Sequence, residues 1–308
     1  MIGAGLARWW FAPAPVERLA ALRIAIGGFA VIWMSARLPE VVAVARLPAG
    51  ELAPVGIIRV LGRALGAPLP VIAVAAIAVA TVGLLIAFTA GVRYRVTAPL
   101  AALGLLWTLS YRNSWGMVFH TDNLLVLHVI ALAAAPAADA WTLGRGAPPR
   151  DAPAAGYGWA IKLLAAITCA AYLLAGIAKL RLAGLSWIDG AQLRNQIAVD
   201  NLRKALLGGT VAPLARLLVA HPGGLVGLSI LTLGLELGAP LALLGRRLAR
   251  WWAWGAWGFH VGVVLAMNVW FPYPLVGIAF LPLLEAEHLV GRPARWWRAC
   301  GMRGAPAR

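Results

Sequence analysis

Cysteine is scarce in this sequence. Cys169 and Cys300 are far apart, and no Cys-x-x-Cys pair occurs in the 308 residues. A disulfide framework and a structural zinc site both need more Cys or His residues at short spacings, so neither is expected. A thiol–disulfide quinone reductase is not expected for the same reason. Cys169 lies within an apolar run and is predicted to be a small packing residue.

Acidic residues and lysines are also few. The chain has 11 Asp and Glu against 27 Lys and Arg, a net charge of +16, and only three of the basic residues are lysines. In a soluble protein this charge would suggest nucleic acid, but no basic stripe with interleaved aromatic residues appears, so we expect no nucleic-acid partner. The arginines fall mostly between apolar runs, where they orient helices and contact anionic headgroups.

Apolar residues dominate what is present. They make up 62% of the chain, and the mean hydropathy is +0.81, whereas soluble domains average about 45–50% apolar. We predict an all-α fold, a polytopic integral membrane helical bundle with about eight transmembrane helices plus interfacial helices. It forms one domain over 1–308, with a core at 8–288 and a short basic tail at 289–308. The expected spans are Leu19–Ala36, Leu69–Ala90, Val96–Tyr111, Phe119–Ala135, Trp159–Leu180, Gly224–Leu244, Trp251–Val269 and Phe271–Leu284.

The segments between the spans set the expected topology. Residues 37–68 predict a loop with short interfacial helices, 136–158 a surface loop, and 181–222 an amphipathic surface helix. With both termini in the cytoplasm, 15 basic residues fall on the cytoplasmic side and 11 on the other, while Lys162 lies within a span. This bias predicts cytoplasmic termini. The N-terminus lacks a short apolar core followed by a cleavage site, so we expect no removable signal peptide.

One expected span carries several polar residues. His120 and Asn123 are three residues apart and share a helix face, and His128 lies two turns further along on roughly the same side. One interpretation is that His120 satisfies a helix end and that Asp122 is exposed. The other is functional, because ionisable groups inside membranes usually serve a function. The spacing leaves both open.

The segment YLLAGIAKLRLAGLSWIDG, at 172–190, places Lys179 near the end of an apolar helix. Burial favours the neutral amine of a lysine, which is what a general base needs. The alternative is that Lys179 snorkels to the membrane interface. Gly176 and its alanine neighbours favour close helix packing over lipid exposure. Trp187 is expected to be an interfacial belt anchor, and the Asp-Gly pair at 189–190 a turn.

A third group of polar residues lies in the later spans. His260 is near mid-span, where a charged imidazole would be costly, so a neutral and hydrogen-bonded ring is expected. It is either an interhelical hydrogen-bonding residue or part of a site. Glu236 is either a protonated interhelical donor or the partner of a basic group. No His-Glu-x-x-His, carboxylate-rich helix pair or Gly-x-Ser-x-Gly occurs, so we expect no metal, haem or serine hydrolase site.

Four sequence blocks, taken in order, resemble the vitamin K-dependent gamma-carboxylase family and its bacterial relatives, which carry the HTTM domain. They are ERLAALRIAIGG near the N-terminus, the block around His120 with DAW at 139–141, the segment at 172–190 with its lysine-leucine pair and W-x-x-G, and GFHVG at 258–262. The resemblance covers roughly residues 8–288. It implies a bacterial protein of the cytoplasmic membrane.

The resemblance also implies quinone chemistry. In the carboxylase a lysine deprotonates a reduced naphthoquinone, which reacts with oxygen, and the strong base so formed removes a proton from glutamate before carbon dioxide adds. By position, Lys179 would be the base, His120 would assist by hydrogen bonding, and His260 would lie nearby. The implied cofactor is a reduced naphthoquinone of the vitamin K or menaquinone type, without a metal. The implied partners are membrane lipids and an isoprenoid quinone.

Two departures from the family limit this implication. Phe119 stands where the carboxylase has asparagine, and the chain ends about 25 residues after its last expected span, whereas the carboxylase continues into a soluble portion that engages its protein substrate. We therefore do not expect carboxylation of protein glutamate. Two hypotheses remain: a quinone-dependent, epoxidase-like enzyme with Lys179 as base, and a non-catalytic membrane protein that binds lipid or transports a small solute.

Overall fold

A computed structural model of the protein describes residues 2–65, 69–143 and 154–290. It is 78% helical, and the described residues form no strand, which confirms the all-α prediction. The α-helices are α1 Ile2–Trp10, α2 Val16–Val44, α3 Gly56–Leu65, α4 Val71–Ala90, α5 Tyr94–Asn113, α6 His120–Ala133, α7 Ala155–Ala183, α8 Ala191–Leu206, α9 Ala215–Ala220, α10 Gly223–Leu237, α11 Arg246–Met267, α12 Pro272–Leu275 and α13 Ala286–Val290. Short 3₁₀ helices are η1 Ala49–Glu51, η2 Gly184–Trp187, η3 Ala239–Leu243 and η4 Ile278–Leu283.

Three helices of the described chain, α2, α4 and α7, are long and apolar enough to cross a membrane. This is consistent with a membrane protein. Helices α6 and α10 are apolar but have only 14 and 15 residues, fewer than the about 20 that a span needs. Helices α5 and α11 are long but less apolar.

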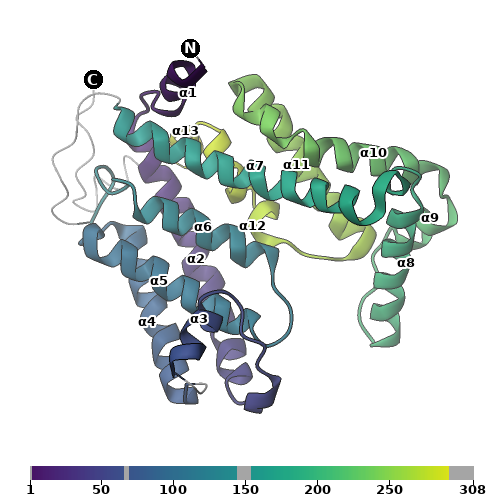
Figure 1. Ribbon diagram of the computed structural model, residues 1–308, viewed down its shortest axis with the longest axis horizontal. Helices are drawn as coiled ribbons and strands as arrows, with labels where there is room; N and C mark the ends of the chain where they lie inside the picture. Colours follow the sequence, from purple (N-terminus) through teal and green to yellow (C-terminus); the bar gives the residue numbers. More distant parts are fainter. Residues whose placement is uncertain (1, 66–68, 144–153, 291–308) are drawn as a thin grey trace. The chain divides into compact units, whose positions relative to one another are not determined.

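The chain divides into two compact units, one of Met1–Leu164 with Glu285–Arg308 and one of Ala165–Leu284. In the first unit, α2 packs against α4, α4 against α5, and α5 against α6 (Figure 1). Helix α2 continues to Val44, past the end expected at Ala36, although it contains Pro39. A proline removes one helical hydrogen bond, and a 2.9 Å ion pair between Arg37 and Glu40 spans the same turn.

Arg23 is a buried structural residue of the first unit and not a headgroup contact. Its guanidinium is fully buried and donates to the carbonyl oxygens of Thr89 at 3.2 Å, Ala137 at 2.6 Å and Ala140 at 3.2 Å, and also to that of Trp141. The Thr89 carbonyl is in the last turn of α4, where backbone acceptors lack helical partners, and the other three carbonyls lie in the turns after α6. One arginine therefore links the end of α4 to the segment that follows α6.

The second unit contains the later part of α7 and helices α8 to α12 (Figure 1). Its core joins Cys169 and Tyr172 of α7 to Trp252 of α11 and Phe280 of η4, and the rings of Tyr172 and Trp252 meet edge-on with centroids 4.9 Å apart. Cys169 is thus the packing residue that was predicted. A helix, α8, is present in 181–222, where the sequence predicted one.

The last expected span does not form one helix. Residues 271–284 form α12 and η4, separated by a turn at Gly277, whose φ is 79°. Pro282 lies inside the segment and removes a backbone donor that a continuous helix would use, whereas Pro272 and Pro274 fall in the first turn, where proline is tolerated. The apolar composition of this stretch produced the expectation of a span, but the turn at Gly277 and Pro282 interrupt the helix.

Candidate functional site

Helix α7 presents two polar side chains on one face of the second unit. Tyr172 and Lys179 are seven residues apart, which is two helical turns or about 10.5 Å along the axis. Gly176 lies between them, and a Cβ added there would be 2.9 Å from Leu237 Cδ2 and 3.0 Å from Glu236 Cβ. Helices α7 and α10 are therefore in close contact at this point, as the small residues of the segment predicted.

At this contact Lys179 of α7 forms an ion pair with Glu236 of α10. The ammonium Nζ donates to the carboxylate Oε1, and the two side chains are 21% and 3% exposed. Of the two roles left open for Glu236, the structure gives it that of partner to a basic group. Lys179 is held by an acid within its own unit, which differs from a snorkelling lysine that reaches only headgroups. The second carboxylate oxygen, Oε2, is buried and has no hydrogen-bond partner among the described residues.

Trp187 covers the ammonium group. The Lys179 Nζ lies 5.2 Å from the centroid of its ring, within the range of a cation–π contact. The side chain is buried and not an exposed belt anchor, so that expectation was wrong. The turn after it is confirmed: Gly190 has a φ of 81°, and the amide of Ala191 donates to Asp189 Oδ1 at 2.8 Å.

The second polar pair joins α7 to α11. Tyr172 Oη and His260 Nε2 share a 2.6 Å hydrogen bond, whose direction follows the imidazole tautomer. His260 is 7% exposed, and its ring meets those of Phe259 and Phe271 at centroid distances of 5.1 and 5.3 Å. The expected hydrogen-bonded ring is confirmed. Tyr172 was not singled out from the sequence, although its seven-residue spacing from Lys179 was a usable signal.

The two pairs lie in the second unit, and each takes one member, Tyr172 or Lys179, from α7. Buried polar atoms without partners are uncommon and destabilising, because they lose water without replacing it. In the described part of the second unit the atoms in this condition are Trp187 Nε1, Ser229 Oγ, Glu236 Oε2 and His260 Nδ1.

His120 belongs to the first unit. It begins helix α6, but its side chain lies outside the described residues. Asp122 is buried, and it accepts hydrogen bonds from Arg112 Nη1 at 2.8 Å and Trp33 Nε1 at 2.9 Å. The interpretation of Asp122 as an exposed residue was therefore wrong. His128 is also buried, with its Nε2 3.2 Å from a backbone carbonyl oxygen of α7. The structure thus groups Lys179 with Glu236 and His260 with Tyr172.

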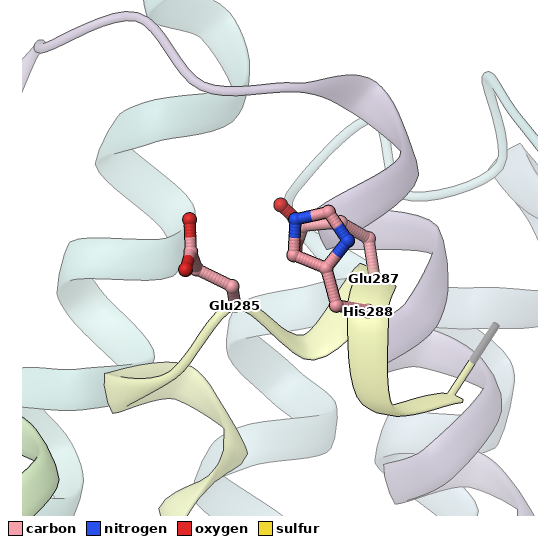
Figure 2. A group of neighbouring side chains, drawn as sticks. All are labelled: Glu285, Glu287 and His288. Atoms are coloured by element: carbon pink, nitrogen blue, oxygen red, sulfur yellow. The ribbon is translucent and has the colours of Figure 1, made fainter.

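Glu285, Glu287 and His288 form a further cluster at α13, with side chains on the same side of the chain (Figure 2). Their ligand atoms lie within 4.8 Å of one another, close enough to hold a metal ion. However, Arg18 donates to Glu287 Oε1 and Oε2 at 2.7 and 2.8 Å and lies 3.6 Å from Glu285. Burial opposes ionisation of Glu287, but the hydrogen bonds and charge of Arg18 outweigh it and lower the pKa of this carboxyl. A cation would have to displace this arginine.

Comparisons with protein-family models, with curated proteins and with solved structures found no match.

Proposed function

We propose that the protein is an HTTM-type membrane protein, resembling the membrane core of vitamin K-dependent gamma-carboxylase, that binds a menaquinone-like quinone and uses Lys179 as a base. The observation that carries the proposal is the Lys179–Glu236 pair, two turns along α7 from the Tyr172–His260 pair. About eight spans, cytoplasmic termini and a bacterial cytoplasmic membrane, in which isoprenoid quinones dissolve, are parts of the same proposal.

The residues of this region suit a quinone headgroup. Such a ring has oxygens on two opposite sides and flat apolar faces, so it needs polar groups at both ends and aromatic groups along it. The Cα atoms of Tyr172 and Lys179 are about 10.5 Å apart along the axis of α7. Unpartnered atoms at both ends, Glu236 Oε2 and His260 Nδ1, offer the required contacts.

The ion pair defines how Lys179 acts. In the pair its nitrogen carries a proton, which passes along the hydrogen bond from Nζ to Glu236 Oε1 before the amine acts as a base. Trp187 shields the ammonium from water on one side. Tyr172 fixes the ring of His260, so that its Nδ1 holds or accepts a proton according to the tautomer. A reduced naphthoquinone, when bound, supplies the electrons and hydroxyl protons that convert oxygen to an epoxide oxygen and water.

The ion pair also supports a second candidate function. A lysine that neutralises a buried carboxylate has a sufficient structural role, because an unpaired charge in this environment is strongly destabilising. Under this alternative the protein is non-catalytic and binds lipid or transports a small solute. The two functions differ in whether Lys179 must lose its proton.

Measuring the formation of quinone epoxide distinguishes the catalytic from the non-catalytic function. The purified full-length protein in lipid nanodiscs would be supplied with a reduced short-chain naphthoquinone and oxygen, and the quinone epoxide measured by mass spectrometry. We expect turnover by the parent protein and none by Lys179→Ala. Lys179→Arg is the sharper variant, because arginine keeps the ion pair but does not give up its proton in proteins, and it should also be inactive.

Lys162→Ala is the matched control. Lys162 lies in the first unit, where its Nζ is 4.5 Å from the centroid of the Trp9 ring, and its loss should leave turnover unchanged. Equal turnover by Lys179→Arg and the parent would contradict the base assignment. A parent protein that neither forms epoxide nor binds the quinone would favour the non-catalytic alternative.

A further inference from the structure

The two oxygens of the Glu236 carboxylate have different surroundings. Oε1 accepts the hydrogen bond from Lys179, whereas Oε2 is buried without a partner among the described residues. The residue is 2% exposed. An ionised carboxylate only accepts hydrogen bonds. A ligand group that meets Oε2 favourably therefore has to be a hydrogen-bond donor.

We propose that Glu236 determines the redox specificity of the quinone site, through Oε2, by admitting the hydroxyl-bearing reduced ring in preference to the oxidised ring. This inference rests on the proposed function and adds to it the residue that distinguishes the two forms. A reduced ring has O–H groups that donate to Oε2. An oxidised ring has only carbonyl oxygens, which accept hydrogen bonds. It would therefore place one acceptor beside another and leave Oε2 without a donor.

The other unpartnered side-chain atoms in the described part of the second unit do not make this distinction. Ser229 Oγ both donates and accepts, so it suits either redox form. Trp187 Nε1 only donates, and both a hydroxyl and a carbonyl oxygen accept from it. Nε2 of His260 is already hydrogen-bonded to Tyr172, which leaves Nδ1 for a ligand. Nδ1 donates in one tautomer and accepts in the other, so it suits either redox form. Among these atoms, discrimination between the two redox forms therefore falls on Glu236.

Equilibrium binding tests the inference without relying on turnover. The full-length protein in nanodiscs would be dialysed, without oxygen, against the reduced and the oxidised form of one short-chain naphthoquinone. A hydrogen bond to a charged acceptor corresponds to about ten- to a hundredfold in affinity, so the reduced form should bind tighter by this factor. In Glu236→Gln the amide both donates and accepts, and the preference should fall to within about threefold.

Two controls keep the test sharp. Glu287→Gln removes an ion-paired acid of the other unit and should retain the full preference. The dimethyl ether of the reduced quinone keeps the ring but lacks both O–H donors, so the unaltered protein should bind it as weakly as the oxidised form. That measurement stands even if Glu236→Gln fails to fold.

The outcomes separate the two proposals. Equal affinity of the parent protein for both redox forms, or an undiminished preference in Glu236→Gln, would overturn the role of Glu236 and leave quinone binding standing. Tight binding of the dimethyl ether would overturn it as well. Failure of both forms to bind would overturn the proposed function and this inference together.

Discussion

Lys179 and Glu236 join α7 to α10 through a single carboxylate oxygen, while the other oxygen of the same carboxylate is buried and unpartnered. The charges of the two side chains therefore balance, but one carboxylate oxygen has no hydrogen-bond partner among the described residues. A purely structural ion pair gains stability when both carboxylate oxygens are satisfied, since unsatisfied lone pairs in a buried site weaken the fold. The half-satisfied carboxylate is the feature that connects stability, binding and chemistry in this unit.

The first prediction concerns the stability of this pair. Lys179→Met leaves the Glu236 charge buried and uncompensated, a change that costs about 3–5 kcal/mol for fully buried pairs and less where one partner is partly exposed. Lys179→Met/Glu236→Gln removes the charge along with its partner and should recover much of the loss. Melting temperatures of the single and double variants in one detergent measure this. A double variant no more stable than Lys179→Met would show that the charge is not the cause.

The second prediction concerns the close approach of α7 and α10. Gly176→Ala places a Cβ within 3.0 Å of atoms of Leu237 and Glu236, so the helices must separate and the ion pair must shift. We expect weaker binding of the reduced quinone and a lower melting temperature. Gly258→Ala is the matched control, because this α11 glycine has no atom within 4 Å of an added Cβ and alanine favours the helix. Equal effects of the two substitutions would contradict the packing argument.

The third prediction is a pH dependence of the first unit. The pKa of Glu287 is lowered in the folded protein, so its pair with Arg18 stabilises the fold above the ordinary glutamate pKa of 4.5, and this stability is lost as the pH falls through the lowered value. Glu287→Gln should melt at a lower temperature than the parent at pH 7, and the difference should shrink in acid. The exposed Glu51→Gln is the control. A difference that stays constant from pH 7 to the acid limit would contradict this account.

The sequence predicts the long apolar helices well. Helices α2, α4 and α7 lie where long, mostly apolar runs occur, because a run of that length has few other ways to satisfy its backbone in a membrane. Their ends are less predictable, as the continuation of α2 through Pro39 to Val44 shows. The final segment was predicted wrongly because hydropathy does not register the turn at Gly277 or the backbone donor that Pro282 lacks.

The site was predictable only in part. Lys179 stood out because lysine is rare in this chain, and His260 because it interrupts an apolar run. Their partners could not be assigned, since Glu236 is 57 residues from Lys179 and the meeting of the two depends on how α7 and α10 rotate and pack. Asp122 was misjudged for the same reason: its partners come from two other helices.

Photolabelling tests the central claim most directly. A reduced naphthoquinone that carries a photoreactive group would be bound to the full-length protein, illuminated and mapped by mass spectrometry. The account predicts label on the peptides that contain Tyr172, Lys179, Trp187, Glu236 or His260, reduced by excess unlabelled reduced quinone and by Glu236→Gln. Label confined to exposed apolar residues, or unaffected by the competitor, would contradict a quinone site at the Lys179–Glu236 pair.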